Sequence, residues 1–373
     1  MKPIIIYILI ISLSIEACKK LYNDPPVQSN ISSLVVECTI TNDPPPYVVN
    51  LTQSIPYNSN LANPIVKYAK VSIIDEDGNI QNVIENPLGT YQTSPTGMQG
   101  KIGKSYKLKI ALTNGKGQTL NTYESDWVKI PVPPTIDSIY AETGQIQTLV
   151  EQPDGTNSIE TQWGINMFID AKPYINQNYY YKVKSTMIQE TTQAYYPNGR
   201  NALPAVLLKL YRWSTNKISL DNNLLFGTAQ SNSQIRKSFI GFIPQFTSNI
   251  VADNNYDVPN TAGVIITANV YSLSKEIYQI FSEENLQTTP TNSIFDPIPT
   301  QLESNIKCTS NSSQSILGYF NAASVTHAYQ YFMFPYYPKN IYSYKIVSLP
   351  SNIPNSGVDT TFAPGFWQSP ISK

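Results

Sequence analysis

The sequence has a single histidine, His327, in 373 residues. A zinc site built from several histidines is therefore excluded, and a histidine-based catalytic triad would need His327 itself. Residues 324–329 alternate like a strand, which favours a structural role for this histidine. Glycine-rich phosphate loops, Gly-x-Ser-x-Gly elbows and Cys-x-x-Cys pairs are also missing. These absences predict a protein that is not an enzyme and has no catalytic residues, no metal and no cofactor.

Charged residues are scarce as well. Asp, Glu, Lys and Arg make up 14% of the chain, against a usual ~25%, and the net charge is −1. Because no dense basic run exists, nucleic acid is excluded as a partner. The 26 Tyr and 28 Pro favour strands and turns over helices.

No apolar run reaches the ~18 residues of a membrane-spanning helix. The apolar run nearest the N-terminus, residues 4–13, follows Lys2 and precedes Ala17 and Cys18. This is the layout of a bacterial lipoprotein signal, although Glu16 is unusual in such a sequence. We expect 1–17 to be a signal peptide, Cys18 to carry a lipid that holds the protein at a membrane, and 18–32 to be a linker. The alternative is a plain signal peptide with a chance cysteine.

Two other cysteines are present, Cys38 and Cys308. An oxidising compartment permits a disulfide between them. Cys38 also lies in the strand-like segment 34–40, where a buried free thiol is an ordinary core residue. The sequence leaves both alternatives open.

From residue 33 onwards, short strand patterns alternate with turns. Asp77-Gly78 and Asn114-Gly115 each fall between two strand patterns, which predicts two β-hairpins. About seven strands in roughly 100 residues indicate an immunoglobulin-like or transthyretin-like β-sandwich over 33–131. The expected strands are 34–41, 47–54, 69–75, 80–85, 105–113 and 119–130.

A proline-rich segment, residues 131–134, marks the end of this first domain, because proline removes a hydrogen-bond donor from a sheet. We expect a second, fibronectin-III-like β domain over 135–373, in which 163–169 and 178–183 resemble paired strands. Its expected strands are 136–142, 159–169, 179–190, 206–213, 238–242 and 262–271.

One helix is predicted, over 273–286, from apolar residues at helical spacing between Leu273 and Phe281. After Tyr329 the chain becomes an aromatic, proline-rich tail. The fold class is therefore all-β, with tandem β-sandwich domains, long insertions in the second domain and one short helix.

Long polar connections are expected at 191–204 and 214–235, and connections of this length are usually functional or mobile. Aromatic side chains with polar tips suit interfaces and sugar platforms. The candidate ligand or partner contacts are Tyr195, Tyr196, Tyr211 and Trp213. The acidic cluster Asp75-Glu76-Asp77 could bind Ca²⁺, but it lacks the spacing of a calcium loop, and a solvated turn is the favoured alternative.

Several segments in a fixed order resemble a family of Bacteroidota lipoproteins defined by a domain of unknown function, DUF4249. The resemblance covers nearly the entire chain. The segments that carry it are 15–18, 33–37, 71–75 with Gly78, 89–91, 106–110, 273–278, 293–299, 305–308 and 316–324.

The resemblance implies an outer-membrane lipoprotein, exposed at the cell surface, of a kind commonly encoded beside TonB-dependent transporters and without an established activity. It also implies a disulfide for Cys308, whose counterpart in relatives pairs with a cysteine in the middle of the chain. The corresponding segment here, 211–214, has no cysteine. Within this resemblance, Cys38 is the only internal candidate partner.

We therefore expect a non-enzymatic accessory or substrate-binding lipoprotein that works with a TonB-dependent transporter in nutrient uptake. The alternative is a structural or adhesive cell-surface protein whose sandwiches act as spacers. A third class is an enzyme built on carboxylates alone, as in glycosidases. The sequence does not identify the ligand.

Overall fold

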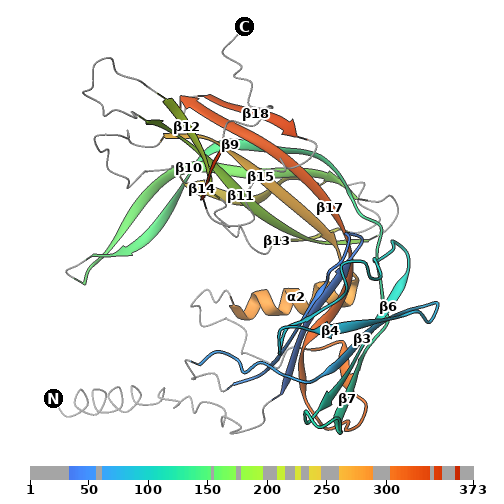
Figure 1. Cartoon of the computed structure of the whole chain (residues 1–373). Coiled ribbons are helices and arrows are strands. Elements are labelled where there is room, and N and C mark those ends of the chain that lie inside the picture. The colour runs from blue at the N-terminus through green and yellow to red at the C-terminus, as the bar shows by residue number, and fades with distance from the viewer. Residues whose placement is uncertain are drawn as a thin grey trace, which may run out of the picture.

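The computed structural model describes residues 33–55, 61–152, 155–173, 178–195, 208–214, 223–227, 235–244, 260–288, 303–336, 340–346 and 358–361. Strands dominate these ranges, and the helix among them is α2 (Lys275–Thr288) (Figure 1). The prediction of an all-β fold is confirmed. Within the same ranges, no helix combines the length and the apolar character needed to cross a bilayer. The strands are β1 (Leu34–Thr41), β2 (Val48–Gln53), β3 (Lys70–Asp75), β4 (Ile80–Glu85), β5 (Tyr91–Gln92), β6 (Ser105–Thr113), β7 (Thr119–Ser125), β8 (Val128–Lys129), β9 (Thr135–Glu151), β10 (Asn157–Lys172), β11 (Tyr179–Tyr195), β12 (Leu208–Ser214), β13 (Asn223–Gly227), β14 (Ile235–Pro244), β15 (Asn260–Ser272), β16 (Ile306–Cys308), β17 (Ile316–Tyr336), β18 (Asn340–Ile346) and β19 (Val358–Thr361).

The N-terminal strands bury alternate residues, as strands with one face on a core should. In β1, every second side chain from Leu34 to Ile40 is buried. Asp77-Gly78 joins β3 to β4, and Asn114-Gly115 joins β6 to β7, both as antiparallel pairs. The two predicted hairpins are therefore confirmed, and the inward faces of these strands form the first hydrophobic core.

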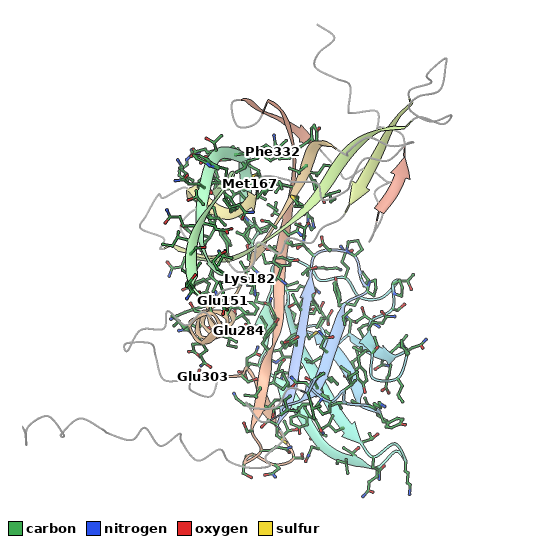
Figure 2. All side chains as sticks on the ribbon, turned by 90° about the vertical axis from the view of Figure 1, so that its left-hand side faces the viewer. Glu151, Met167, Lys182, Glu284, Glu303 and Phe332 are labelled. Carbon is green, nitrogen blue, oxygen red and sulfur yellow. The ribbon has the colours of Figure 1, made fainter. Side chains whose placement is uncertain are left out.

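β17 links this first core to the second. Its residues from Ile316 to Ala323 run parallel to β1, and those from Ser324 to Met333 run antiparallel to β15. Figure 2 shows β17 as one long ribbon that reaches the second core, where Phe332 and Met167 are both buried. One continuous strand therefore belongs to both halves of the molecule.

The packing crosses the predicted domain limits of 33–131 and 135–373. α2 places Ile277, Ile280 and Phe281 in the first core, where Ile306 of β16 also lies. β16 pairs with β7, so the C-terminal part of the sequence extends the N-terminal sheet. The boundary predicted between 131 and 135 stays a prediction, but residues from both predicted domains build the first core.

The second core lies between two layers. β9, β10 and β14 form a three-stranded sheet in the order β14-β10-β9, while β11, β15 and β17 belong to the large sheet. Buried side chains from both layers meet, among them Met167 of β10 and Val183 of β11. The predicted pairing of 163–169 with 178–183 is therefore wrong. These segments pack against each other from different sheets, because alternation determines which face is buried but not which strand is the neighbour.

The two predicted long connections contain more strand than expected. β11 continues to Tyr195, which takes residues 191–195 out of the predicted loop 191–204. β13 lies within the predicted loop 214–235 and pairs with β11. Polar residues here occupy strands in a large, partly exposed sheet, where a strand needs only one apolar face.

Candidate interaction surface

The β9–β10 hairpin extends beyond the sheet to which it belongs. β14 pairs with β10 only between Gly164 and Ala171, so past Gly164 the hairpin has no third strand among the described residues. Gly144 and Gly164 stand opposite each other at this point. A Cβ on Gly164 would lie 2.3 Å from the carbonyl oxygen of Ile243, so a larger residue does not fit there. Figure 1 shows the described residues beyond this point, 145–152 and 155–163, projecting away from both sheets; we call them the arm.

One face of the arm carries three large exposed apolar side chains. Leu149 and Ile159 are directly opposed across the two strands, and each is 68% exposed. Trp163, four residues along β10 from Ile159, is 54% exposed. Side chains an even number of residues apart lie on the same face of a strand, so the three share one face. Exposed apolar side chains gathered in this way mark interaction sites.

A tight turn closes the tip of the arm. The Gln152 N–H donates to the Thr156 carbonyl (2.7 Å), and the Gly155 N–H donates to the Gln152 carbonyl (2.9 Å). The Gln152 side-chain amide donates to Ser158 Oγ (2.5 Å). Glu151 lies near this tip, far along the arm from Met167 in the second core (Figure 2). Because an isolated two-stranded hairpin is only marginally stable in water, we infer that the base and these tip bonds hold the arm in shape.

The arm is not among the candidate sites that the sequence predicts. The expected strands began or ended at 142 and 159, because Gly144 and the polar Gln and Thr residues interrupt the apolar pattern. A usable signal is the Pro153-Asp154-Gly155 segment, which is typical of a turn between two strands. With Ile146, Leu149 and Ile159 on either side, it could have indicated a hairpin.

The large sheet is also hollowed on one side, over β3, β6 and β7. The hollow has a volume of about 250 Å³. Lys109 lies 3.0 Å from one carboxylate oxygen of Glu124, and Lys107 lies 3.4 Å from the other. The hydrogen bond from Lys109, reinforced by the hydrogen bond and charge of Lys107, holds the pKa of Glu124 below its ordinary value, although burial opposes the shift. Lys109 and Glu124, which both line the hollow, are therefore paired with each other.

His327 joins three elements. Its Nε2 lies 2.9 Å from a carboxylate oxygen of Asp43, which follows β1, and its Nδ1 lies 2.7 Å from Oδ1 of Asn269 on β15. Burial and the nearby Asp43 carboxylate both raise the pKa of Tyr271 and of Tyr329. The histidine thus has hydrogen-bonding partners on both ring nitrogens and connects the end of β1 to β15 and β17.

The two internal cysteines are buried free thiols, and no disulfide joins them. Cys38 pairs in register with Val49 and Phe320, whereas Cys308 pairs with Tyr123 on β7. Burial raises the pKa of the Cys38 thiol to about 12, so this thiol is protonated and unreactive in the folded protein.

The acidic cluster forms the turn between β3 and β4. Asp75 Oδ1 accepts hydrogen bonds from the backbone N–H groups of Asp77 (3.1 Å) and Asn79 (2.9 Å), and Oδ2 accepts one from the Asn79 side chain (2.9 Å). The Asp77 carboxylate bonds Lys104, and the Glu76 carboxylate accepts from the Ser105 N–H. These carboxylates serve the turn itself. No group of three or more potential ligands that could hold a metal ion occurs in the described part of the chain.

The other predicted site residues are placed only in part. Tyr195 ends β11, and Tyr211 and Trp213 lie in the adjacent β12, where they pair in register with Thr192 and Glu190. The side chains of these three aromatic residues lie outside the described part of the structure, as do Tyr196 and the whole segment 1–32 with Cys18. The predicted contacts and the lipid site therefore stay predictions.

Comparison with known proteins gives one match. No curated protein and no solved structure matches the chain. The family model of a domain of unknown function, DUF4249, matches residues 23–328, which include the arm, β17 as far as Ala328, the buried residues of the first core and those of the second core except Phe332. Because that match covers most of the sequence, the chain belongs to the DUF4249 family.

Proposed function

We propose that this protein is a non-enzymatic outer-membrane lipoprotein, held by a lipid on Cys18 and exposed at the cell surface. In this proposal it is an accessory or substrate-binding partner of a TonB-dependent transporter in nutrient uptake. The layout of residues 1–18 supports the anchor. The resemblance described above supports the kind of partner.

The observation that carries a binding role is the arm. Leu149, Ile159 and Trp163 remain exposed on a projecting hairpin, where they lower the solubility of the protein unless another surface covers them. A scaffold of two packed cores that presents one exposed hairpin is suited to contact with a partner. The adhesive alternative would use the same arm against another cell.

The proposal is tested with the full chain in its native membrane. Metabolic labelling with a fatty acid is expected to mark the wild-type protein and not Cys18→Ala. A pull-down from membranes solubilised in mild detergent is expected to recover a β-barrel transporter with wild type, while Cys18→Ala is expected to leave the membrane fraction. An unlabelled wild-type protein, or a labelled one that never recovers a transporter, would contradict the proposal.

A further inference from the structure

We propose that the arm docks on another protein, at an apolar surface rimmed by Lys or Arg side chains. This inference rests on the proposed function in one respect, since the partner is sought among membrane proteins. It goes further by assigning the contact to the arm and by stating the chemistry of the surface that meets it.

The apolar part of the contact is the row Leu149, Ile159 and Trp163. Exposed apolar side chains scattered over a surface are normal. These three differ, because Leu149 and Ile159 are opposed and Trp163 lies on the same face of the same ribbon. Opposed side chains on neighbouring strands have Cβ atoms roughly 5 Å apart, so the pair presents one continuous apolar surface.

The charged part of the contact is acidic only. Between Thr143 and Trp163 the sequence has carboxylates but no Lys, Arg or His. Among the described residues, Glu151 lies two positions from Leu149 and on the same face, whereas Glu160 follows Ile159 directly and lies on the opposite face of the ribbon. At the base of the arm, Lys237 already pairs with Glu142 (2.8 Å). A partner that covers the apolar row therefore meets Glu151 beside it, on a ribbon whose sequence contains no basic side chain, and complementary potential favours basic side chains around the partner's apolar patch.

The same features exclude the two other possible occupants. A bilayer cannot satisfy the backbone N–H and C=O groups on the open edges of a two-stranded ribbon, and the arm has no cation to meet anionic headgroups. A second copy would bring two acidic arms together, and like charges across a contact are destabilising. The edges of the arm contain no Lys and no Pro within the strand segments 145–151 and 157–163, so a strand of the partner could also pair with them.

The test uses a photo-crosslinker on the apolar face, in the full-length protein in its native membrane. Thr161→p-benzoyl-phenylalanine places the reactive group between Ile159 and Trp163, and Leu120→p-benzoyl-phenylalanine on β7 is the control position. We expect a crosslink only from position 161, to a peptide of another protein that contains apolar residues and at least two Lys or Arg. Glu151→Lys with Glu160→Lys is expected to reduce its yield by about tenfold or more.

A matched pair of triple variants separates the arm from exposed apolar residues in general. Leu149→Ser, Ile159→Ser and Trp163→Ser together should abolish the crosslink. Leu120→Ser, Ile80→Ser and Trp127→Ser, at positions that are 57%, 63% and 50% exposed, should leave it unchanged. The triple Ser variant could lose crosslinking because the arm loses its shape. The variant Glu151→Lys with Glu160→Lys changes only exposed carboxylates, so a reduced yield from it still reports on the contact itself.

Several results would overturn the inference: no crosslink from position 161, a crosslink to lipid or to a second copy, a partner peptide without basic residues, or a yield insensitive to charge reversal. The inference and the proposed function fail separately. A crosslink to a basic, apolar surface on a protein other than a transporter supports the arm and contradicts the transporter partnership. A transporter that co-purifies equally with both triple variants supports the transporter partnership and contradicts the docking of the arm.

Discussion

Gly318 lies in β17, opposite Val36 of β1. Its φ is +87°, and a Cβ added to it would lie 2.0 Å from the carbonyl oxygen of Val36, its partner across the two strands. The Gly318 carbonyl also accepts a hydrogen bond from Ser304 Oγ (2.7 Å). Both the backbone conformation and the close approach therefore require glycine here.

Gly318→Ala is expected to lower the free energy of unfolding by roughly 3 kcal/mol or more, because strain at positive φ and a backbone clash act together. Gly117→Ala is the control, since Gly117 has a φ of +88° but open space around its Cα. That variant should cost only about 1 kcal/mol. Urea unfolding of both proteins measures the difference, and equal losses would show that the contact with Val36 is unimportant.

The Asp75 carboxylate, which accepts the hydrogen bonds of the β3–β4 turn, makes the stability of the folded protein depend on pH in the acid range. Burial raises the pKa of its carboxyl, but the hydrogen bonds from Asn79 and Asp77 and the nearby Lys104 together bring the pKa below the ordinary value of 3.8. A carboxyl with a lowered folded pKa contributes stability that is fully present above its unfolded pKa. That contribution is lost as the pH falls through the folded pKa.

We therefore expect wild-type stability to fall when the pH drops below about 4, and Asp75→Asn to show a weaker fall in this range. At neutral pH the variant should be less stable by about 1 kcal/mol, because an amide accepts fewer of these hydrogen bonds. Urea unfolding from pH 3 to pH 7 checks both expectations. An acid slope that is the same in the two proteins would argue against Asp75 as its source.

At the scale of elements, strands with a regular alternation were predictable and their partners were not. β1, β4 and β6 have the bounds that their patterns predict, and α2 lies within two residues of the predicted helix. The partners of β11 lie in β12, β13 and β15, and β15 comes from a distant part of the sequence. Local alternation contains no information about such pairing, which tertiary packing decides.

The candidate site was unpredictable for a related reason. Sequence patterns find residues that a core buries, and the arm is defined by residues that no core buries. Leu149 and Ile159 look like ordinary strand residues until the structure shows that β14 ends beside Gly164. One loop that seemed the natural place for contacts, 191–204, holds Tyr195 in a strand instead.

At the scale of the whole molecule, the first core depends on residues from both ends of the chain. Ile277 and Phe281 of α2, Ile306 of β16 and Phe320 of β17 lie in it beside side chains of β1 and β6. The parallel pairing of β1 with β17 joins residues some 280 positions apart, as Val36 and Gly318 illustrate. Contacts at such separations have no local signature in a sequence.

A fragment of residues 33–131 is therefore expected not to fold, although its pattern predicts a complete sandwich. It lacks the β17 neighbour of β1 and the apolar side chains that α2 contributes to the core. Residues 33–373 are the positive control. Dispersed amide resonances and a cooperative unfolding transition from the short fragment would show that it is an independent domain after all.

The parallel pairing of β1 and β17 also determines how the molecule bears tension. The chain enters β1 at Leu34, and β17, which runs in the same direction, leaves the pair at its other end, at Ala323, towards the half that carries the arm. A force between the N-terminal segment and a bound arm therefore acts along the two strands in opposite senses. All the backbone hydrogen bonds between β1 and β17 then resist it together. This geometry resists shear, because the hydrogen bonds between β1 and β17 cannot break one after another, and such resistance is what the proposed anchor at Cys18 and the proposed docking of the arm would require of the fold.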